Sequence, residues 1–202
     1  AKFFFNEDIS KPLESYVDLL KDIVFQEKLG TIYEKTVRVG KLAKRIADYL
    51  EVGEETKKNI ARASYLSKAD LVTKMVTEFT ELQGKMGMEY ASISGENEIV
   101  SLAIYQQYLP KYAGDELPTT TAGSILSIAD KLDTIAGLFA IGIRPTGSQD
   151  PFGLRRSALG IINIILEKKL DLFLKDLIEF ALYTYVDENG LAFNYNKVNE
   201  EI

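Results

Sequence analysis

The chain has 202 residues, of which 46% are hydrophobic and 27% are charged, a composition typical of one globular domain with a well-filled core. It contains no cysteine and no histidine, which excludes disulfides, Cys/His zinc sites, thiol nucleophiles and imidazole bases. A net charge of −6 argues against broad, sequence-blind binding of nucleic acid, but a local basic patch is compatible with it.

Hydropathy and the N-terminus predict a cytoplasmic protein with no membrane partner. The longest apolar run, residues 135–143, is too short to span a bilayer, and no basic region followed by an apolar core marks a signal peptide. The sequence opens at Ala1 and has three phenylalanines at 3–5, where exposed aromatic rings are unfavourable. We therefore expect a piece of a longer chain, with residues 1–10 extending from a preceding domain.

The first half of the chain is predicted to form helices separated by glycine and proline. Ser10 and Pro12 mark the first helix, and Thr31 with Glu34 forms a capping-box pattern that starts the second. Further helical segments are expected over 54–71, 72–90 with breaks at Gly84 and Gly87, and 96–109 before Pro110. The expected buried residues are Leu13, Tyr16, Val17, Leu20, Val24, Val39, Leu42, Ala43, Ile46, Leu50, Ile60, Ala63, Leu66, Met75, Val76, Phe79, Leu82, Ile99, Val100, Ala103 and Ile104.

A long apolar helix is predicted between the loop at 111–120 and a Gly/Pro-rich loop at 142–149. Its apolar residues recur at helical spacing, which indicates a central place in a packed bundle. The stripe consists of Ile125, Ile128, Ala129, Leu132, Ile135, Ala136 and Phe139, with Asp130, Lys131 and Asp133 at its edge.

Two more helices are expected after this loop. Asp150 can cap the first and Pro151 can stand in its first turn, while Asp171 can cap the second. Their expected buried residues are Ala158, Leu159, Ile162, Ile165 and Leu166, then Phe173, Leu177, Ile178 and Ala181. A turn at 187–190, a short strand or extended tail at 191–195 and a frayed end complete an all-α bundle of about seven to eight helices.

Three arginines surround the second loop and the helix after it. Arg155 and Arg156 lie in the first turns of the helix, where the helix dipole disfavours cations, and Arg144 lies in the loop. Together with Lys131 they form a candidate basic face for an anionic partner. Pairing with an internal Asp or Glu is an equally weighted alternative.

Several long stretches resemble one family in the same order. ADKLDTIAGLFAIGIRPTGSQDPFGLRR at 129–156 is the longest, and FQEKLGT, KADLVT, ELQG, YLP and GDELP precede it. Over about residues 3–166 the chain resembles the middle of the beta subunit of the bacterial tetrameric glycyl-tRNA synthetase.

This resemblance implies an enzyme that joins glycine to tRNA(Gly) with ATP and Mg²⁺. It also implies an alpha-beta heterotetramer in which the alpha subunit holds the aminoacylation site and the beta subunit recognises tRNA. The alpha subunit and tRNA(Gly) are therefore the expected partners. We expect this piece to contain no catalytic residues, to need no cofactor and to be inactive alone.

Three segments also resemble an HD-type phosphohydrolase domain, which would span residues 11–186 and leave 187–202 as a tail or linker. In that superfamily a His, a His-Asp doublet and a later Asp hold a catalytic divalent metal. The corresponding positions here are Lys35, Ala69, Asp70 and Asp130, so both imidazoles are missing.

The missing ligands predict a domain without metal and without hydrolase activity, in which Lys35 pairs with Asp70 or Asp130. Two alternatives remain from other functional classes. One is an active metal-dependent HD phosphohydrolase, and the other is a structural spacer that contacts no RNA.

Overall fold

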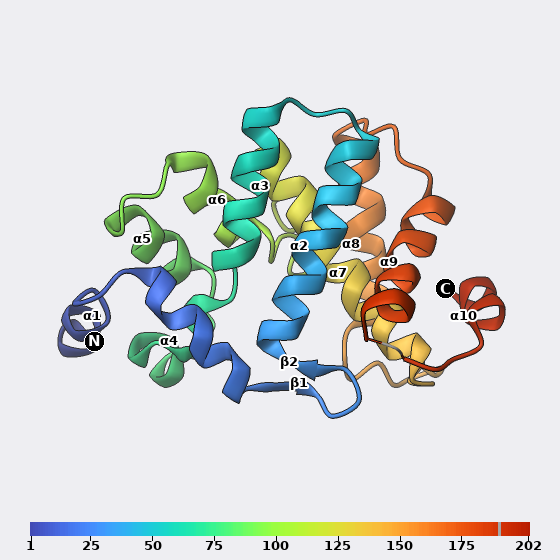
Figure 1. Ribbon diagram of the computed structural model, residues 1–202, viewed down its shortest axis with the longest axis horizontal. Coiled ribbons are helices and arrows are strands. Elements are labelled where there is room, and N and C mark those ends of the chain that lie inside the picture. Colours follow the sequence, from blue (N-terminus) through green and yellow to red (C-terminus); the bar gives the residue numbers. More distant parts are fainter. Residues whose placement is uncertain (190) are drawn as a thin grey trace.

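The chain folds almost entirely into helices (Figure 1). The computed structural model describes residues 1–189 and 191–202, and this part contains ten α-helices, three 3-10 helices and two short strands. The α-helices are α1 (Lys2–Asp8), α2 (Ile32–Tyr49), α3 (Glu54–Leu66), α4 (Lys74–Glu78), α5 (Lys85–Ile93), α6 (Glu98–Gln106), α7 (Thr121–Ala140), α8 (Leu154–Glu167), α9 (Leu174–Asn189) and α10 (Tyr195–Glu201). The 3-10 helices are η1 (Leu13–Asp22), η2 (Ala69–Val72) and η3 (Thr80–Leu82), and β1 (Val24–Gln26) pairs antiparallel with β2 (Gly30–Thr31). The predicted all-α class is confirmed, with more helices than expected.

Helix α7 is the centre of the fold. It contacts α2, α3, α6, α8, α9 and α10, and in Figure 1 it runs through the middle of the molecule. The predicted stripe is buried from Ile125 to Ala136, and Phe139 is partly buried. Residues on the other sides of the helix, such as Ala122, Ser127 and Leu138, are buried as well. A helix enclosed on almost all sides must satisfy any charged group it carries from its neighbours.

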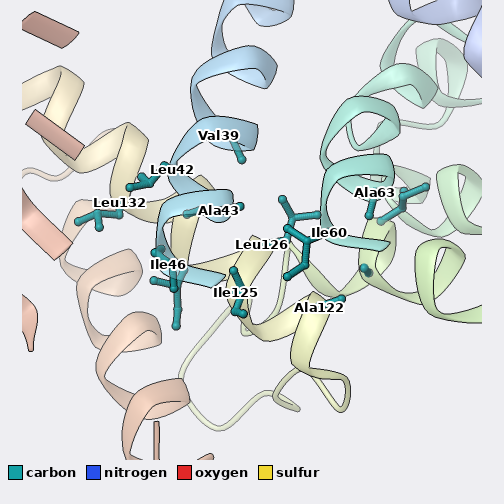
Figure 2. Packing of buried hydrophobic residues seen from close by; sticks show 14 of the residues in the cluster. Val39, Leu42, Ala43, Ile46, Ile60, Ala63, Ala122, Ile125, Leu126 and Leu132 are labelled. Atoms are coloured by element: carbon teal, nitrogen blue, oxygen red, sulfur yellow. The ribbon is translucent and has the colours of Figure 1, made fainter. Parts of the chain in front are cut away.

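Three helices meet in the part of the core drawn in Figure 2. Leu42 and Ile46 of α2, Ile60 of α3 and Leu126 of α7 are each at most 1% exposed. Burying one such side chain contributes about 1.5–3 kcal/mol, so these contacts fix α2 against α7. The same packing carries Lys35, one turn before Val39, up to the surface of α7.

The start of α2 forms as predicted. Thr31 Oγ1 accepts a hydrogen bond from the Glu34 amide at 3.2 Å, and Glu34 Oε2 accepts one from the Thr31 amide at 2.7 Å. This capping box satisfies two N–H groups that the first turn of the helix would otherwise leave unpaired. It is a local signal, and it determines where the helix that carries Lys35 begins.

Some predictions for the first half are wrong. Val24 is 66% exposed because it lies in β1, and Ile99 and Phe79 are also exposed. The segment predicted at 54–71 is divided, since α3 ends at Leu66 and a separate 3-10 turn follows. Gly87 lies within α5 and does not break it, whereas Gly84 stands at its N-cap with a φ of 77°.

The face chosen for α8 is wrong as well. Leu159 and Leu166 are 59% and 68% exposed, and the helix instead buries Leu154, Ile161 and Ile164. The helix also begins at Leu154, three residues after Pro151. In the next helix, α9, Leu177 and Ala181 are buried as predicted, but Phe173 before it is 63% exposed.

The C-terminal part is more helical than predicted. Helix α9 continues to Asn189, so a turn over 187–189 is wrong, and Gly190 lies outside the described residues. The expected boundary between 186 and 187 falls inside α9. After an irregular stretch at 191–194, α10 takes the place of the frayed end and contacts α7 and α9.

The N-terminal residues are also part of the packed structure. Helix α1 contacts α4, and Phe4 and Phe5 are partly buried, while Phe3 is 72% exposed. Asp8 is 2% exposed and accepts hydrogen bonds from the amides of Lys74 and Met75, both at 2.9 Å. Across the described ranges, no helix is both long and apolar enough to cross a membrane.

Candidate functional site

Lys35 connects α2 to α7 through a buried ammonium group. Its side chain is 5% exposed, and Nζ donates to Asp133 Oδ2 at 2.9 Å and to Thr134 Oγ1 at 2.8 Å. It also lies 3.6 Å from Asp130 Oδ1 and donates to the Asp130 carbonyl at 3.2 Å. The predicted pairing with Asp130 is therefore present, but the stronger partner is Asp133. Asp70, the other predicted partner, forms no ion pair with Lys35 in the described structure.

Asp133 has a second cation beside it. Arg38 Nε donates to Asp133 Oδ1 at 2.9 Å, while another nitrogen of the guanidinium donates to the Leu29 carbonyl at 3.0 Å. Arg38 and Asp133 are each 2% exposed. Tyr185 of α9 donates its hydroxyl proton to the Asp133 carbonyl at 3.0 Å. Three helices thus meet at one buried charge cluster, which needs every partner because an unpaired buried charge is costly.

Asp130 lies between several lysines. Lys68, which is 5% exposed, places Nζ 3.2 Å from Asp130 Oδ1 and 4.3 Å from the centre of the Tyr108 ring. Burial alone would raise the pKa of Asp130, but attraction to Lys68, Lys35 and Lys131 outweighs it and lowers the pKa to about 2. Asp130 is therefore ionised at neutral pH and is held by cations contributed by the protein.

Asp70 and Ala69, at the start of η2, take no part in these ion pairs. Ala69 is fully buried among apolar side chains. Asp70 is also fully buried, and its Oδ2 accepts the amides of Gly84 at 2.6 Å and Gly87 at 3.0 Å. Burial raises the pKa of Asp70 to about 6, although these two hydrogen bonds oppose the shift. Asp70 therefore fixes the turn before α5.

This set of residues does not fit a catalytic metal. In the described part of the chain, no three Asp, Glu, His or Cys side chains converge on a point that could hold an ion. Lys35 and Lys68 bring positive charge to the carboxylate that would bind it. Asp70 directs one oxygen at two amides, so it cannot replace the missing imidazoles.

Lys131 is buried, and this corrects its place in the predicted basic face. It is 8% exposed, and Nζ donates to the carbonyls of Leu109 at 2.9 Å and Gln107 at 3.2 Å and to Ser127 Oγ at 2.7 Å. Burial lowers the pKa of Lys131 to about 8. All three of its donors are used by neutral acceptors, so it contributes charge to its surroundings but no free hydrogen bond.

The three arginines have different surroundings. Arg144 forms an ion pair with Glu201 of α10, which agrees with the internal-partner alternative. Arg155 donates to the carbonyls of Thr146 at 2.7 Å and Gly147 at 3.4 Å. Arg156 is exposed, and its side chain has no ion pair or hydrogen bond within the described residues. Of the predicted cluster, Arg156 is thus the side chain available to a partner.

Asp150 caps α8 even though it lies four residues before the helix. Its carboxylate accepts the amides of Leu154 at 2.8 Å and Arg155 at 2.9 Å. Burial alone would raise the pKa of Asp150, but the hydrogen bonds from these two amides and attraction to the side chains of Arg155 and Arg156 together lower it. The amides of Leu154 and Arg155 are therefore already paired and do not bind an anion.

The sequence reading missed Lys68 and Arg38 as members of the cluster. Arg38 and Lys35 fall on the buried side of α2 together with Val39 and Leu42, and this position could have indicated buried charges. Lys68 has no such signal, because it lies in a turn between α3 and η2 and its partner is 62 positions away on α7.

These features define an all-helical domain whose central charge cluster is held by lysine and arginine and is unsuited to a metal ion. The sequence model of the family described as "Glycyl-tRNA synthetase beta subunit" matches residues 1–201. The chain belongs to this family.

Known relatives agree with this assignment. The glycine--tRNA ligase beta subunit of Clostridioides difficile (strain 630) is 57% identical over all 202 residues, which correspond to 29% of that protein. The beta subunit of Desulforamulus reducens is 50% identical over all 202 residues, again 29% of its length. That of Hahella chejuensis is 54% identical over 181 residues, or 90% of this chain and 26% of the relative. The chain therefore spans less than a third of the curated relatives that it matches.

Proposed function

We propose that this chain is a non-catalytic, HD-like domain that supports the ATP-dependent joining of glycine to tRNA(Gly). Its membership of the beta-subunit family supports the overall reaction. The observation that carries the non-catalytic role is the pair of buried lysines, Lys35 and Lys68, on Asp130. Positive side chains at this point hold the helices together but cannot activate water for hydrolysis.

In this proposal the domain works inside a heterotetramer with the alpha subunit in the cytoplasm. The alpha subunit would hold the aminoacylation site, and ATP and Mg²⁺ would be used there. The 202-residue chain alone would then not charge tRNA. Mixing it with the alpha subunit, tRNA(Gly), glycine and ATP should yield no glycyl-tRNA above the alpha subunit alone.

The contact surface proposed for tRNA or the alpha subunit is centred on Arg156, with Arg155 beside it. Both are exposed at the start of α8, and Arg156 has no partner among the residues described. Arg144 is less suited, because it is paired with Glu201. A guanidinium group can bind a phosphate through two parallel hydrogen bonds, which favours this kind of partner.

The test replaces Arg155 and Arg156 by Ala in the complete enzyme. We expect weaker tRNA(Gly) binding in a filter assay and a higher KM for tRNA, or loss of alpha-subunit association in size-exclusion chromatography. Lys168→Ala, which removes an exposed cation at the other end of α8, is the matched control. Unchanged charging together with unchanged assembly would favour the spacer alternative.

A further inference from the structure

A cavity of about 220 Å³ lies between α7, the first turn of α8 and the segment after α6. It is lined by Gln107, Tyr108, Pro110, Lys111, Asp130, Lys131, Arg156 and Ser157, and we call it the Lys111–Arg156 cavity. One water molecule takes about 30 Å³ of liquid volume, so the cavity can hold a small group larger than water. It is smaller than the roughly 300–1,000 Å³ of a site for a drug-sized ligand.

Positive charge exceeds negative charge around this cavity. Three of its lining residues are cations and one, Asp130, is an anion. Asp130 is already compensated by Lys68 at 3.2 Å and by Lys35 at 3.6 Å, neither of which lines the cavity. Lys131 is attracted to Asp130 as well, but its three donors contact neutral oxygens and it forms no ion pair with that carboxylate. An anion is therefore the ligand that the cavity favours.

The two cations at the edge of the cavity have unused donors. Lys111 is exposed, and its ammonium lies 5.1 Å from the centre of the Tyr105 ring but within 4 Å of no carboxylate in the described structure. The Arg156 guanidinium likewise has no hydrogen-bond acceptor there. Because they come from different segments and line one cavity, they can contact the same anion from two sides.

Buried polar atoms around the cavity also lack partners. Tyr108 Oη and Gln107 Oε1 are buried and make no hydrogen bond to any described residue. Of these two atoms, Tyr108 Oη is the one that can donate to an anion, whereas Gln107 Oε1 is an acceptor only. Native proteins leave few such atoms unsatisfied, since each costs about 1–3 kcal/mol. Burial raises the pKa of Tyr108 well above its ordinary value, so the phenol keeps its proton and can donate it.

We propose that the Lys111–Arg156 cavity binds the phosphate group of a phosphate monoester without a metal ion. Arg156, Lys111 and the Tyr108 hydroxyl donate to the phosphate oxygens, and Lys131 adds charge from below the surface. The remaining volume accommodates the first atoms of the ester group. This inference goes beyond the proposed function, because it names a ligand class and does not require that ligand to be tRNA.

The experiment titrates the 202-residue chain with ligands while amide shifts are followed by NMR. The ligands are inorganic phosphate, AMP, adenosine, and an RNA tetranucleotide with either a 5′-phosphate or a 5′-hydroxyl. We expect saturable shifts around 107–111, 130–131 and 156–157 with phosphate and AMP, and none with adenosine. Stronger binding of the phosphorylated RNA than of AMP would assign the ester to an RNA end, and the reverse would assign it to a free nucleotide.

Three variants locate the site. Arg156→Ala and Lys111→Ala each remove a charge-assisted contact and should weaken phosphate binding at least roughly tenfold. Tyr108→Phe removes one neutral hydrogen bond and should weaken it about fivefold without unfolding the protein, because the hydroxyl has no protein partner. Lys168→Ala should change nothing.

Two results would overturn the proposal. One is the absence of saturable shifts with inorganic phosphate, AMP and phosphorylated RNA in a chain whose amide spectrum shows that it is folded. The other is equal affinity of all four variants, which would mean an adventitious ion only.

Circular dichroism and amide dispersion check the fold of each variant. If the chain does not fold alone, the same ligands are titrated into the complete beta subunit and into its Tyr108→Phe variant. Equal affinity of these two proteins for phosphate would then overturn the proposal. These experiments measure phosphate binding and not aminoacylation of tRNA. A negative result therefore contradicts the phosphate site without contradicting the proposed tRNA contact.

Discussion

Lys35 Nζ lies 2.9 Å from Asp133 Oδ2, in an ion pair whose two side chains are 5% and 2% exposed. The pair joins α2 to α7, the two helices that contribute most of the core in Figure 2. A buried carboxylate is tolerated only while its partners stay in place. Lys35 thus has a structural task at a position where the resemblance to HD-type domains would predict a histidine.

Replacement of Lys35 by Met tests this task. The variant keeps the length of the side chain but leaves Asp133 with Arg38 alone, and it should lower the free energy of unfolding by about 3 kcal/mol. Urea denaturation followed by circular dichroism measures the change. Lys44→Met is the control, since Lys44 lies on the same helix but pairs with Asp48 at 75% exposure and should have almost no effect. Equal midpoints for the two variants would contradict the structural role.

Asp70 should give the protein an unusual pH dependence. Its pKa is about 6 in the folded state against an ordinary value of 3.8, so the folded state binds the proton more tightly than the unfolded state. Protonation of Asp70 therefore stabilises the fold, and this contribution is lost as the pH rises from about 4 to about 6. Asp70→Asn keeps one oxygen for the two glycine amides and should abolish this slope. As the pH rises across this range, the free energy of unfolding of the wild type should fall relative to that of Asp70→Asn. Urea denaturation of both proteins at several pH values measures this difference.

Asp130 serves as a control, because its contribution to stability changes with pH in the opposite direction to that of Asp70. Its pKa is lowered from 3.8 to about 2, so its contribution to stability is present above pH 4 and is lost as the pH falls through 2. Asp130→Asn should therefore change the slope only below about pH 4. A steeper loss of stability for the Asp70→Asn protein above pH 4 than for the wild type would rule out the raised pKa of Asp70.

Local signals in the sequence predicted much of the fold. The capping box at Thr31 and Glu34 needs only residues three apart, and the stripe of α7 repeats over about four turns. Both were confirmed for that reason. The prediction of the buried face of α8 was wrong because its sequence offers two apolar faces. Whether the face with Leu159 or the face with Ile161 is buried depends on where α7 lies. That information is tertiary and has no local pattern.

The candidate site was predictable only in part. The sequence places a lysine and an aspartate where metal ligands are expected, which is enough to predict a loss of metal binding. It does not show that Lys68 reaches Asp130, or that Lys131 turns inward to the Leu109 carbonyl. Long lysine side chains can reach either solvent or a buried acceptor, and only the packed helices decide between them.

Manganese titration tests the absence of a metal centre. The protein should show no saturable binding of Mn²⁺ at micromolar concentrations in electron paramagnetic resonance, because Lys35 and Lys68 carry positive charge to the Asp130 carboxylate. It should also hydrolyse no nucleotide in the presence of Mn²⁺ or Mg²⁺. Tight binding or turnover that disappears in Asp130→Asn would establish the phosphohydrolase alternative instead.

The contact between α7 and α9 is tight enough to require glycine at position 137. A Cβ added to Gly137 would lie 2.6 Å from Tyr185 Cζ and 2.9 Å from Leu29 Cδ1, and neither side chain has room to move in the core. Gly137→Ala should cost about 1–3 kcal/mol from overpacking, offset in part by about 1 kcal/mol of better helix propensity. The melting temperature should fall by roughly 2–4 °C for each net kcal/mol in a chain of this size. Gly147→Ala is the matched control, since no atom lies within 4 Å of the added Cβ, and its melting temperature should be unchanged. If Gly137→Ala melts above the wild-type temperature, α9 does not pack on α7 as closely as described.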